Sequence, residues 1–183
     1  MGTNARVNRG PAAAAQNRAA IIRAAGEIFA EQGLNAPLNA IAKRAGVGQG
    51  SLYRHFPTRA SLAYAAFDQG LAEIEALTAR GGTLAQVLAL VTEQARASVA
   101  FLELLAPLAQ EPDWASLGVR IRAVIEATIV EGVRSGTVPA HYTVDDVLLA
   151  IRMVAGALAG SVEGTREAVS AGAWRLLGIE VHT

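Results

Sequence analysis

Hydrophobic side chains recur every three or four positions along most of this 183-residue chain, and no stretch alternates with a period of two for long. Such spacing places the apolar side chains on one face of an α-helix. Alanine, leucine, glutamate and arginine are abundant, and all four are good helix formers. The pattern therefore predicts an all-α protein.

The first part of the pattern predicts a basic arm over residues 1–14 and then a helix to about Gln32. Gly33 is expected to end this helix in a left-handed conformation. A second helix is expected from Pro37, because proline suits the first helical position. The apolar stripe of the first helix is predicted to consist of Ile21, Ala25, Ile28 and Phe29.

A glycine turn at Gly46 separates the second helix from a third, which we expect from about residue 48 to residue 56. Two short helices joined in this way are typical of a helix-turn-helix, whose second helix presents its N-terminal residues to DNA bases. Leu52 and Phe56 are four residues apart and can pack inward. The open side is then expected to carry Gln49, Ser51, Tyr53, Arg54 and His55.

The rest of the chain is predicted to form a larger helical body. Helices are expected over residues 59–80, 83–109, 113–135, 144–163 and 165–177. Gly136 can close the third of these, and Thr143 with Asp146 has the spacing of a capping box at the start of the fourth. We therefore expect two domains, an arm with a helix-turn-helix over residues 1–62 and a helical domain over residues 63–183.

Charge divides along the same line, although the formal net charge is zero. Residues 1–60 hold eight basic and two acidic side chains, a net charge of +6. Residues 61–183 hold eight basic and fourteen acidic side chains, a net charge of −6. The split favours an N-terminal segment that binds a polyanion, and chance clustering on a solvated surface is the alternative.

Several protein classes are disfavoured by what the sequence lacks. There is no cysteine, so neither a disulfide framework nor thiol chemistry is expected. The apolar run at residues 147–162 is shorter than a membrane span and includes Arg152. The three histidines lie far apart and no HExxH, Walker or G-x-S-x-G motif occurs. We expect a cytoplasmic protein without metal, cofactor or enzymatic activity, although residues remote in sequence could still assemble a site.

The stretch "PLNAIAKRAGVGQGSLYRHFPTRASL", residues 37–62, resembles the DNA-binding signature of the tetracycline-repressor (TetR) family of bacterial regulators. The spacing matches over the whole stretch, and "IIRAAGEIFAEQG" before it resembles the first helix of that family. The resemblance is specific over about residues 16–67. The positions that carry it are Ile41-Ala42, Ala45-Gly46-Val47, Gly50, Leu52-Tyr53, His55-Phe56, Arg59 and Leu62.

The resemblance implies roles for individual residues on DNA. Phosphate contacts are implied for Tyr53, His55 and Arg59, and contacts with bases or neighbouring phosphates for Gln49, Gly50, Ser51 and Arg54. Asn39 matches a further contact position, while Lys43 and Arg44 either reach a phosphate or are solvated. Tyr53 could instead be a core aromatic, and His55 could be a structural residue packed against the fourth helix.

Two positions depart from the family pattern. Gly48 stands where the family often has Ser or Thr, and Ala36 with Pro37 stands where it often has Thr. Two hydroxyl–phosphate contacts are therefore not expected. Arg6 and Arg9 of the arm are candidates to substitute for them.

For the body, the resemblance implies a homodimer formed by the last two helices and a cavity for a small molecule. Gly156, Gly160 and Gly164 recur every four residues and suit close approach of a second copy, or close packing within one subunit. Candidate lining residues are Phe101, Leu104, Leu105, Trp114, Ile121, Ile125 and Met153, with Glu103, Arg120 and Arg122 as polar candidates. The apolar residues could equally be ordinary core, and the charged ones solvated.

We therefore expect an all-α homodimeric transcriptional regulator associated with the bacterial nucleoid. Its expected partners are a pseudo-palindromic double-stranded DNA operator, a second copy of the chain and a small-molecule ligand. We expect it to act as a repressor that leaves its operator when the ligand binds. A helical architectural protein that binds DNA without sequence preference is the alternative. A comparison of the protein's affinity for one operator with its affinity for random DNA distinguishes the regulator from the architectural protein.

Overall fold

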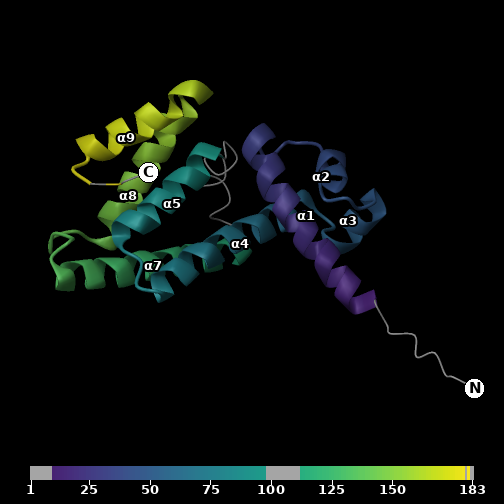
Figure 1. Ribbon diagram of the computed structural model, residues 1–183, viewed down its shortest axis with the longest axis horizontal. Helices are drawn as coiled ribbons and strands as arrows, with labels where there is room; N and C mark the ends of the chain where they lie inside the picture. Colours follow the sequence, from purple (N-terminus) through teal and green to yellow (C-terminus); the bar gives the residue numbers. More distant parts are fainter. Residues whose placement is uncertain (1–9, 98–111, 180, 182–183) are drawn as a thin grey trace, which may run out of the picture.

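The computed structural model describes residues 10–97, 112–179 and 181, and contains helices without any strand over these ranges. In Figure 1, α1, α2 and α3 gather at one end of the molecule, and α5, α7, α8 and α9 at the other. The elements are α1 (Gly10–Gln32), α2 (Leu38–Arg44), α3 (Gln49–His55), α4 (Arg59–Ala79), α5 (Leu84–Ala97), α7 (Pro112–Ser135), α8 (Val144–Ala159), the 3-10 helix η2 (Glu163–Thr165) and α9 (Arg166–Leu176). The predicted all-α class is confirmed.

One apolar cluster holds the N-terminal helices together. It joins α1, α2 and α3 to the first turns of α4, and we call these elements the head. All four residues of the predicted apolar stripe of α1 belong to this cluster and are buried: Ile21, Ala25, Ile28 and Phe29. They pack with the buried residues Ile41, Leu52, Phe56 and Leu62 from the other three helices.

Glycines set the turns of the head as the sequence predicts. Gly33 has φ +78° and Gly46 has φ +68°, a conformation that costs glycine little and other residues more. The start of α1 differs from the prediction, because residues 10–14 are helical rather than part of an arm. Pro11 suits a first helical turn, and four alanines follow it, which explains the earlier start.

Helix α4 belongs to both ends of the molecule (Figure 1). Thr58 and Ser61 cap its N-terminus in a reciprocal capping box. Ala63 and Ala65 lie in the head cluster, whereas Ile74 packs against Val87 and Val124 of the helices beyond. The helix therefore runs without a break through the predicted domain boundary between residues 62 and 63.

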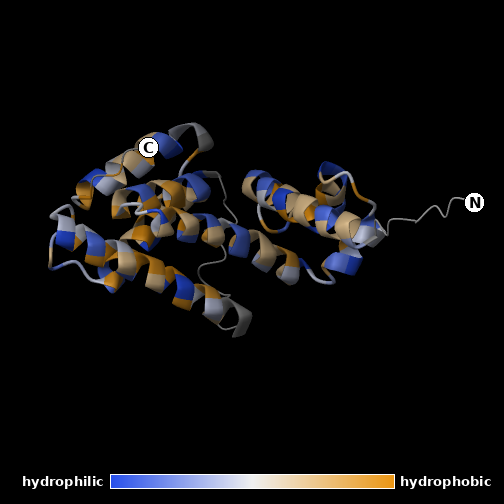
Figure 2. Cartoon of the chain, turned by 60° about the horizontal axis from the view of Figure 1, so that its bottom comes forward, coloured by the Kyte–Doolittle hydropathy of each residue, from blue (hydrophilic) through white to orange (hydrophobic). Residues whose placement is uncertain are grey.

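The body comprises the second half of α4 together with α5, α7, α8 and α9. Figure 2 shows hydrophobic and hydrophilic residues on different sides of these helices. The main core, formed by α5, α7, α8 and α9, includes the buried Leu88, Ile125, Val147, Leu158 and Trp174. Thr143 and Asp146 form the predicted capping box at the start of α8, and Gly136 follows α7 with φ +74°.

Two helices of the body differ from the prediction. The expected helix over residues 83–109 is described only to Ala97, so the remainder lies outside the described residues. Helix α8 ends at Ala159, four residues early, because the chain closes there with a Ser161 N–H to Leu158 carbonyl bond of 3.1 Å. Gly156 is thus within α8, Gly160 caps it and Gly164 lies in η2. The four-residue recurrence of the glycines therefore does not continue along a single helix.

Candidate nucleic-acid interface

The α2–turn–α3 unit carries the candidate interface. Leu52 and Phe56 anchor α3 to the head, with only 1% and 3% of their surfaces exposed. Tyr53 on the opposite side is 51% exposed, so it is not a core aromatic. Gln49, Gly50 and Arg54 are also exposed, while Ser51 and His55 are half-buried. The face predicted to meet DNA is therefore accessible along its length.

The first residues of α3 present little side-chain bulk. Gly48 is the N-cap residue and has no side chain to bond the helix. A Cβ added at Gly48 or Gly50 would meet no atom of the chain within 4 Å. The glycines are thus not required by packing inside the head. Their effect is to leave room for a partner to approach the backbone closely.

Arg54 and His55 both have contacts within the head. Arg54 Nε donates a hydrogen bond to the Gly50 carbonyl one turn earlier, at 3.2 Å. The His55 ring lies 6.5 Å from the ring of Phe56, between centroids, and is tilted by 48°. His55 is half-buried beside its neighbour Phe56, which does not decide between a phosphate contact and packing against the fourth helix.

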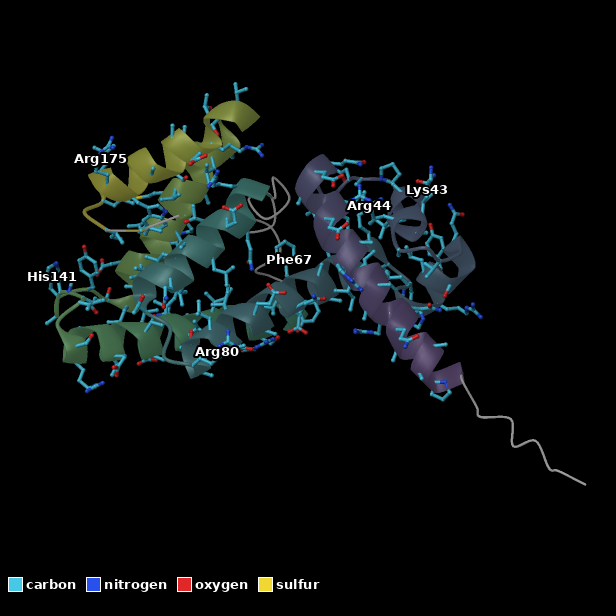
Figure 3. All side chains as sticks on the ribbon, in the orientation of Figure 1. Lys43, Arg44, Phe67, Arg80, His141 and Arg175 are labelled. Atoms are coloured by element: carbon cyan, nitrogen blue, oxygen red, sulfur yellow. The ribbon has the colours of Figure 1, made fainter. Side chains whose placement is uncertain are left out.

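Lys43 and Arg44 are adjacent in α2 but lie in different surroundings (Figure 3). Arg44 pairs with Glu27 and Glu31 of α1, each with a nitrogen–oxygen distance of 3.0 Å. The Arg44 hydrogen bonds lower the pKa of the Glu31 carboxyl and raise that of the guanidinium. Both side chains are exposed, but Arg44 ties α2 to α1 through these ion pairs.

These pairs also shape the charge of the head. Glu27 and Glu31 are the two acids of residues 1–60, and Arg44 engages both on the side where α1 meets α2. Within the described part of this segment, the ion pairs of Glu27 and Glu31 are both with Arg44. Arg6 and Arg9 lie outside the described residues, and Asn39 is exposed in the first turn of α2.

Arg59 has a contact that the sequence did not predict. It is the first residue of α4 and is half-buried. Its Nη1 donates to the Leu34 carbonyl at 2.6 Å and also to the Ala36 carbonyl. The guanidinium thus holds the loop between α1 and α2. The one hint in the sequence is that Ala36 and Pro37 give α2 no side-chain cap.

The candidate ligand-binding residues of the body do not come together in the described part of the chain. Phe101, Glu103, Leu104 and Leu105 lie outside it, as does the side chain of Trp114. Ile125 is buried and Ile121 half-buried in the body core, as ordinary core residues. Met153 is 53% exposed, so its predicted place in a cavity is wrong. The inward face of α8 is formed instead by Val147, Ala150, Ile151, Val154 and Leu158.

The charged candidates of the body are held in ion pairs. Arg120 binds both oxygens of Glu75 at 2.8 Å and one oxygen of Asp68 at 2.5 Å. Arg122 binds Asp145 at 2.7 Å. Arg120 therefore fixes α7 to α4 rather than facing a cavity.

A groove of about 390 Å³ lies elsewhere, between α1 and α4. It was not predicted, because half of its lining residues are alanines and the two helices that contribute them are far apart in the chain. Its lining is Ala15, Arg18, Ala19, Ile22, Ala65, Asp68, Gln69 and Ala72.

Gly156, Gly160 and Gly164 are all exposed. A Cβ added at Gly156 or Gly164 would meet nothing of the same chain within 4 Å. The alternative that these glycines allow close packing within one subunit is therefore wrong. Leu149 and Met153 lie on the same side of α8 as Gly156 and are 50% and 53% exposed.

Two further kinds of feature are absent from the described residues, a metal-binding cluster and a membrane-spanning helix. No three histidine, aspartate or glutamate side chains there are grouped so that they could hold a metal ion. In the same ranges, no helix has the length and apolar character needed to cross a bilayer.

Comparison with known proteins connects these features to a family. The sequence profile of "Bacterial regulatory proteins, tetR family" matches residues 21–66, which cover the head from α1 to the first turns of α4. A curated HTH-type transcriptional regulator of Staphylococcus aureus (strain USA300) is 44% identical over 52 residues. The chain spans only 28% of the length of that relative, and the matched part is 28% of the chain.

Solved structures extend the likeness to the body. The TetR transcriptional regulator SCO0520 from Streptomyces coelicolor is 27% identical, with a TM-score of 0.67 over 91% of this chain and 99% of that one. The regulator FadR from Bacillus subtilis, solved with stearoyl-CoA, is 21% identical, with a TM-score of 0.52 over 90% and 99%. The chain thus carries a segment of the TetR family of bacterial regulatory proteins at residues 21–66, on a fold that over nearly its whole length resembles the TetR regulator SCO0520.

Proposed function

We propose that this chain is a sequence-specific DNA-binding transcriptional regulator that acts as a homodimer. The observation that carries the proposal is the accessible polar face of α3, anchored by the buried Leu52 and Phe56. A helix held in this way can enter the DNA major groove while its fold remains unchanged. The two acids of the segment, Glu27 and Glu31, are engaged by Arg44, so they do not oppose the approach of phosphates.

Within this face we assign two roles. Gln49 and Arg54 are proposed to read bases, because an amide or a guanidinium can form two hydrogen bonds with one base edge. Tyr53, His55 and Lys43 are proposed to contact phosphates, and Gly50 and Ser51 to permit or add contacts near the start of α3. Phosphate contacts fix the register of a protein on DNA, whereas base contacts supply the sequence preference.

The second copy is proposed to bind at α8 and α9. One head can read only one half-site, and two-fold symmetric dimers bind pseudo-palindromic operators. The exposed apolar residues of these helices include Leu149, Met153 and Leu176, the last with 86% of its surface exposed. Exposed Gly156, on the same side of α8 as Leu149 and Met153, allows a second helix to approach closely, because it adds no side chain.

We further propose that the regulator is a repressor released from DNA by a small molecule bound in the body. FadR from Bacillus subtilis, which shares the fold, was solved with stearoyl-CoA, which shows that a protein of this architecture holds a small molecule. A ligand can release DNA only if it binds the DNA-free arrangement of the heads more tightly than the DNA-bound one. Helix α4 can carry that difference, since it packs in both the head and the body.

The experiment that tests the proposed function is selection of bound duplexes from a randomised DNA library by the full-length protein. A pseudo-palindromic consensus bound well above random DNA is the expected result, with specific affinities typically about 10³–10⁷ times higher. Equal affinity for all sequences would instead support the architectural alternative. Absence of any DNA binding would contradict both.

A further inference from the structure

The contact of Arg59 with the α1–α2 loop has a consequence for DNA reading. Arg59 Nη1 donates to two backbone carbonyls, those of Leu34 and Ala36. Ala36 is only 3% exposed, so its carbonyl has little access to water. If the guanidinium turned outward to reach a phosphate, both carbonyls would lose this donor. A buried acceptor left without a partner is costly.

The start of α2 depends on this loop more than most helix starts do. Pro37 is the N-cap residue, and no side chain bonds the first amides of the helix. Helices usually gain stability from a Ser, Thr, Asp or Asn at this position. Here the loop is held by the Ala36 amide donating to the Gly33 carbonyl at 3.1 Å, and by Arg59 from α4.

Asn39 lies two residues after Pro37, exposed in the first turn of α2. Its position relative to DNA is therefore set by the loop that Arg59 holds. We propose that Arg59 is a positioning residue, which fixes the start of α2 and so the placement of Asn39, rather than a phosphate anchor. The part of this inference that concerns DNA rests on the proposed function, whereas its effect on the loop does not.

The bonding pattern favours arginine at this place. A guanidinium forms charge-assisted hydrogen bonds with carbonyls and keeps its charge at any physiological pH. A glutamine at position 59 keeps one amide donor on a shorter side chain and removes the charge. Arg59→Gln therefore separates the loss of charge from the loss of all donors, and Arg59→Ala removes both.

The first test needs no DNA. Amide hydrogen exchange of full-length wild type, Arg59→Gln and Arg59→Ala is compared, with circular dichroism as the check on folding. Exchange of the Ala36 amide should accelerate on the order of tenfold in Arg59→Ala, because the charged donor to the Leu34 and Ala36 carbonyls that holds this loop is lost. It should accelerate less in Arg59→Gln. Amides in α3 should keep their rates. Unchanged exchange at Ala36 in both variants would overturn the inference.

The second test uses DNA, with Asn39→Ala and Arg23→Ala as matched variants. Arg23 is an exposed basic residue of α1, so its removal takes away one charge of the head without touching the loop. On a randomised operator library, Arg59→Ala should relax preference at the same positions as Asn39→Ala. A phosphate anchor would instead lower the salt slope by about 0.9 per half-site with preference unchanged, and that result would overturn the inference.

The two tests separate this inference from the proposed function. A wild type that prefers no DNA sequence contradicts the proposed function, while the exchange result still decides the role of Arg59 in the loop. A wild type that selects an operator, with an Arg59→Ala variant that behaves as a phosphate anchor, contradicts only the inference. If Arg59→Ala does not fold, Arg59→Gln supplies both measurements.

Discussion

Trp174 Nε1 donates a hydrogen bond to Thr92 Oγ1 over 2.9 Å, and both side chains are buried. The threonine hydroxyl in turn donates to the Leu88 carbonyl one turn earlier in α5, at 2.6 Å. This pair joins α9 to α5 inside the body core. A buried indole N–H needs such an acceptor, because it cannot bond to water there.

Replacing Thr92 with valine should destabilise the body. The substitution keeps the shape of the side chain but leaves the indole N–H without its acceptor, at a cost of about 1–3 kcal/mol. Urea unfolding followed by tryptophan fluorescence measures the effect. Thr92→Ser keeps the hydroxyl and is the matched control, and equal stability of the valine and serine variants would contradict the prediction.

Acid should weaken the contact between α4 and α7. Hydrogen bonds from Arg120 lower the pKa of the Glu75 carboxyl below its ordinary value of 4.5. The contribution of this pair to folding stability is therefore present above pH 4.5 and is lost as the pH falls through the lowered pKa. The Glu75→Gln variant should lack this contribution to folding stability at all pH values. Chemical unfolding of both proteins from pH 7 to pH 3 checks this, and a stability difference that did not shrink in acid would contradict it.

DNA binding should depend strongly on salt, and the dependence should come from the head. The logarithm of the affinity is expected to fall with the logarithm of salt concentration by about 0.9 for each phosphate neutralised. Titrations of one duplex at several salt concentrations measure this slope. Arg134→Ala, which removes a charge of the body paired with Glu131, should leave the slope unchanged. A flat response of the wild type would be incompatible with the expected electrostatic contacts.

Gln49→Ala should change which DNA is preferred. Loss of a bidentate base contact is expected to cost about 1–3 kcal/mol at particular operator positions and little elsewhere. Lys43→Ala should weaken binding to all DNA sequences to a similar degree, because a phosphate carries no sequence information. Binding of both variants to a randomised operator library distinguishes the patterns. Identical profiles for the two variants would show that the roles are wrongly assigned.

Gly156→Leu should weaken the homodimer. The monomer has room for a side chain there, so the head and body should stay folded, while a close interface would be forced apart at about 1–3 kcal/mol on each side. Gly118→Leu in α7, where a Cβ also meets nothing, is the matched control. Sedimentation at several concentrations measures the dimer. If Gly156→Leu remained as tight a dimer as the control, the contact would lie on another surface.

The head was largely predictable because its determinants are local. Gly33, Gly46 and the spacing of Leu52 and Phe56 each act within a few residues, and the observed turns and buried faces follow from them. The contacts of Arg44, Arg59 and Arg120 were not predictable in the same way. They join residues between 13 and 52 positions apart, and a basic residue in the sequence does not show which acid or carbonyl it will meet.

The body was predictable as a set of helices but not as a site. Apolar spacing places Ile125 and Met153 equally well on an inward face, and only the packing of α8 shows that Met153 is outside. The groove beside Ala19 and Ala65 lies between α1 and α4, so it depends on how the two helices pack rather than on either sequence alone. The DNA-contact roles remain predictions.

The sharing of α4 between head and body limits how the protein can be divided. A fragment that ended at residue 62 would lack Ala63 and Ala65, which complete the apolar cluster of the head. A fragment that began at residue 63 would lack the capping box of Thr58 and Ser61 and expose the start of the helix. Because Ile74 of the same helix packs against Val87 and Val124, deletion studies that cut within or at either end of α4 would measure the loss of a core rather than the independence of a domain.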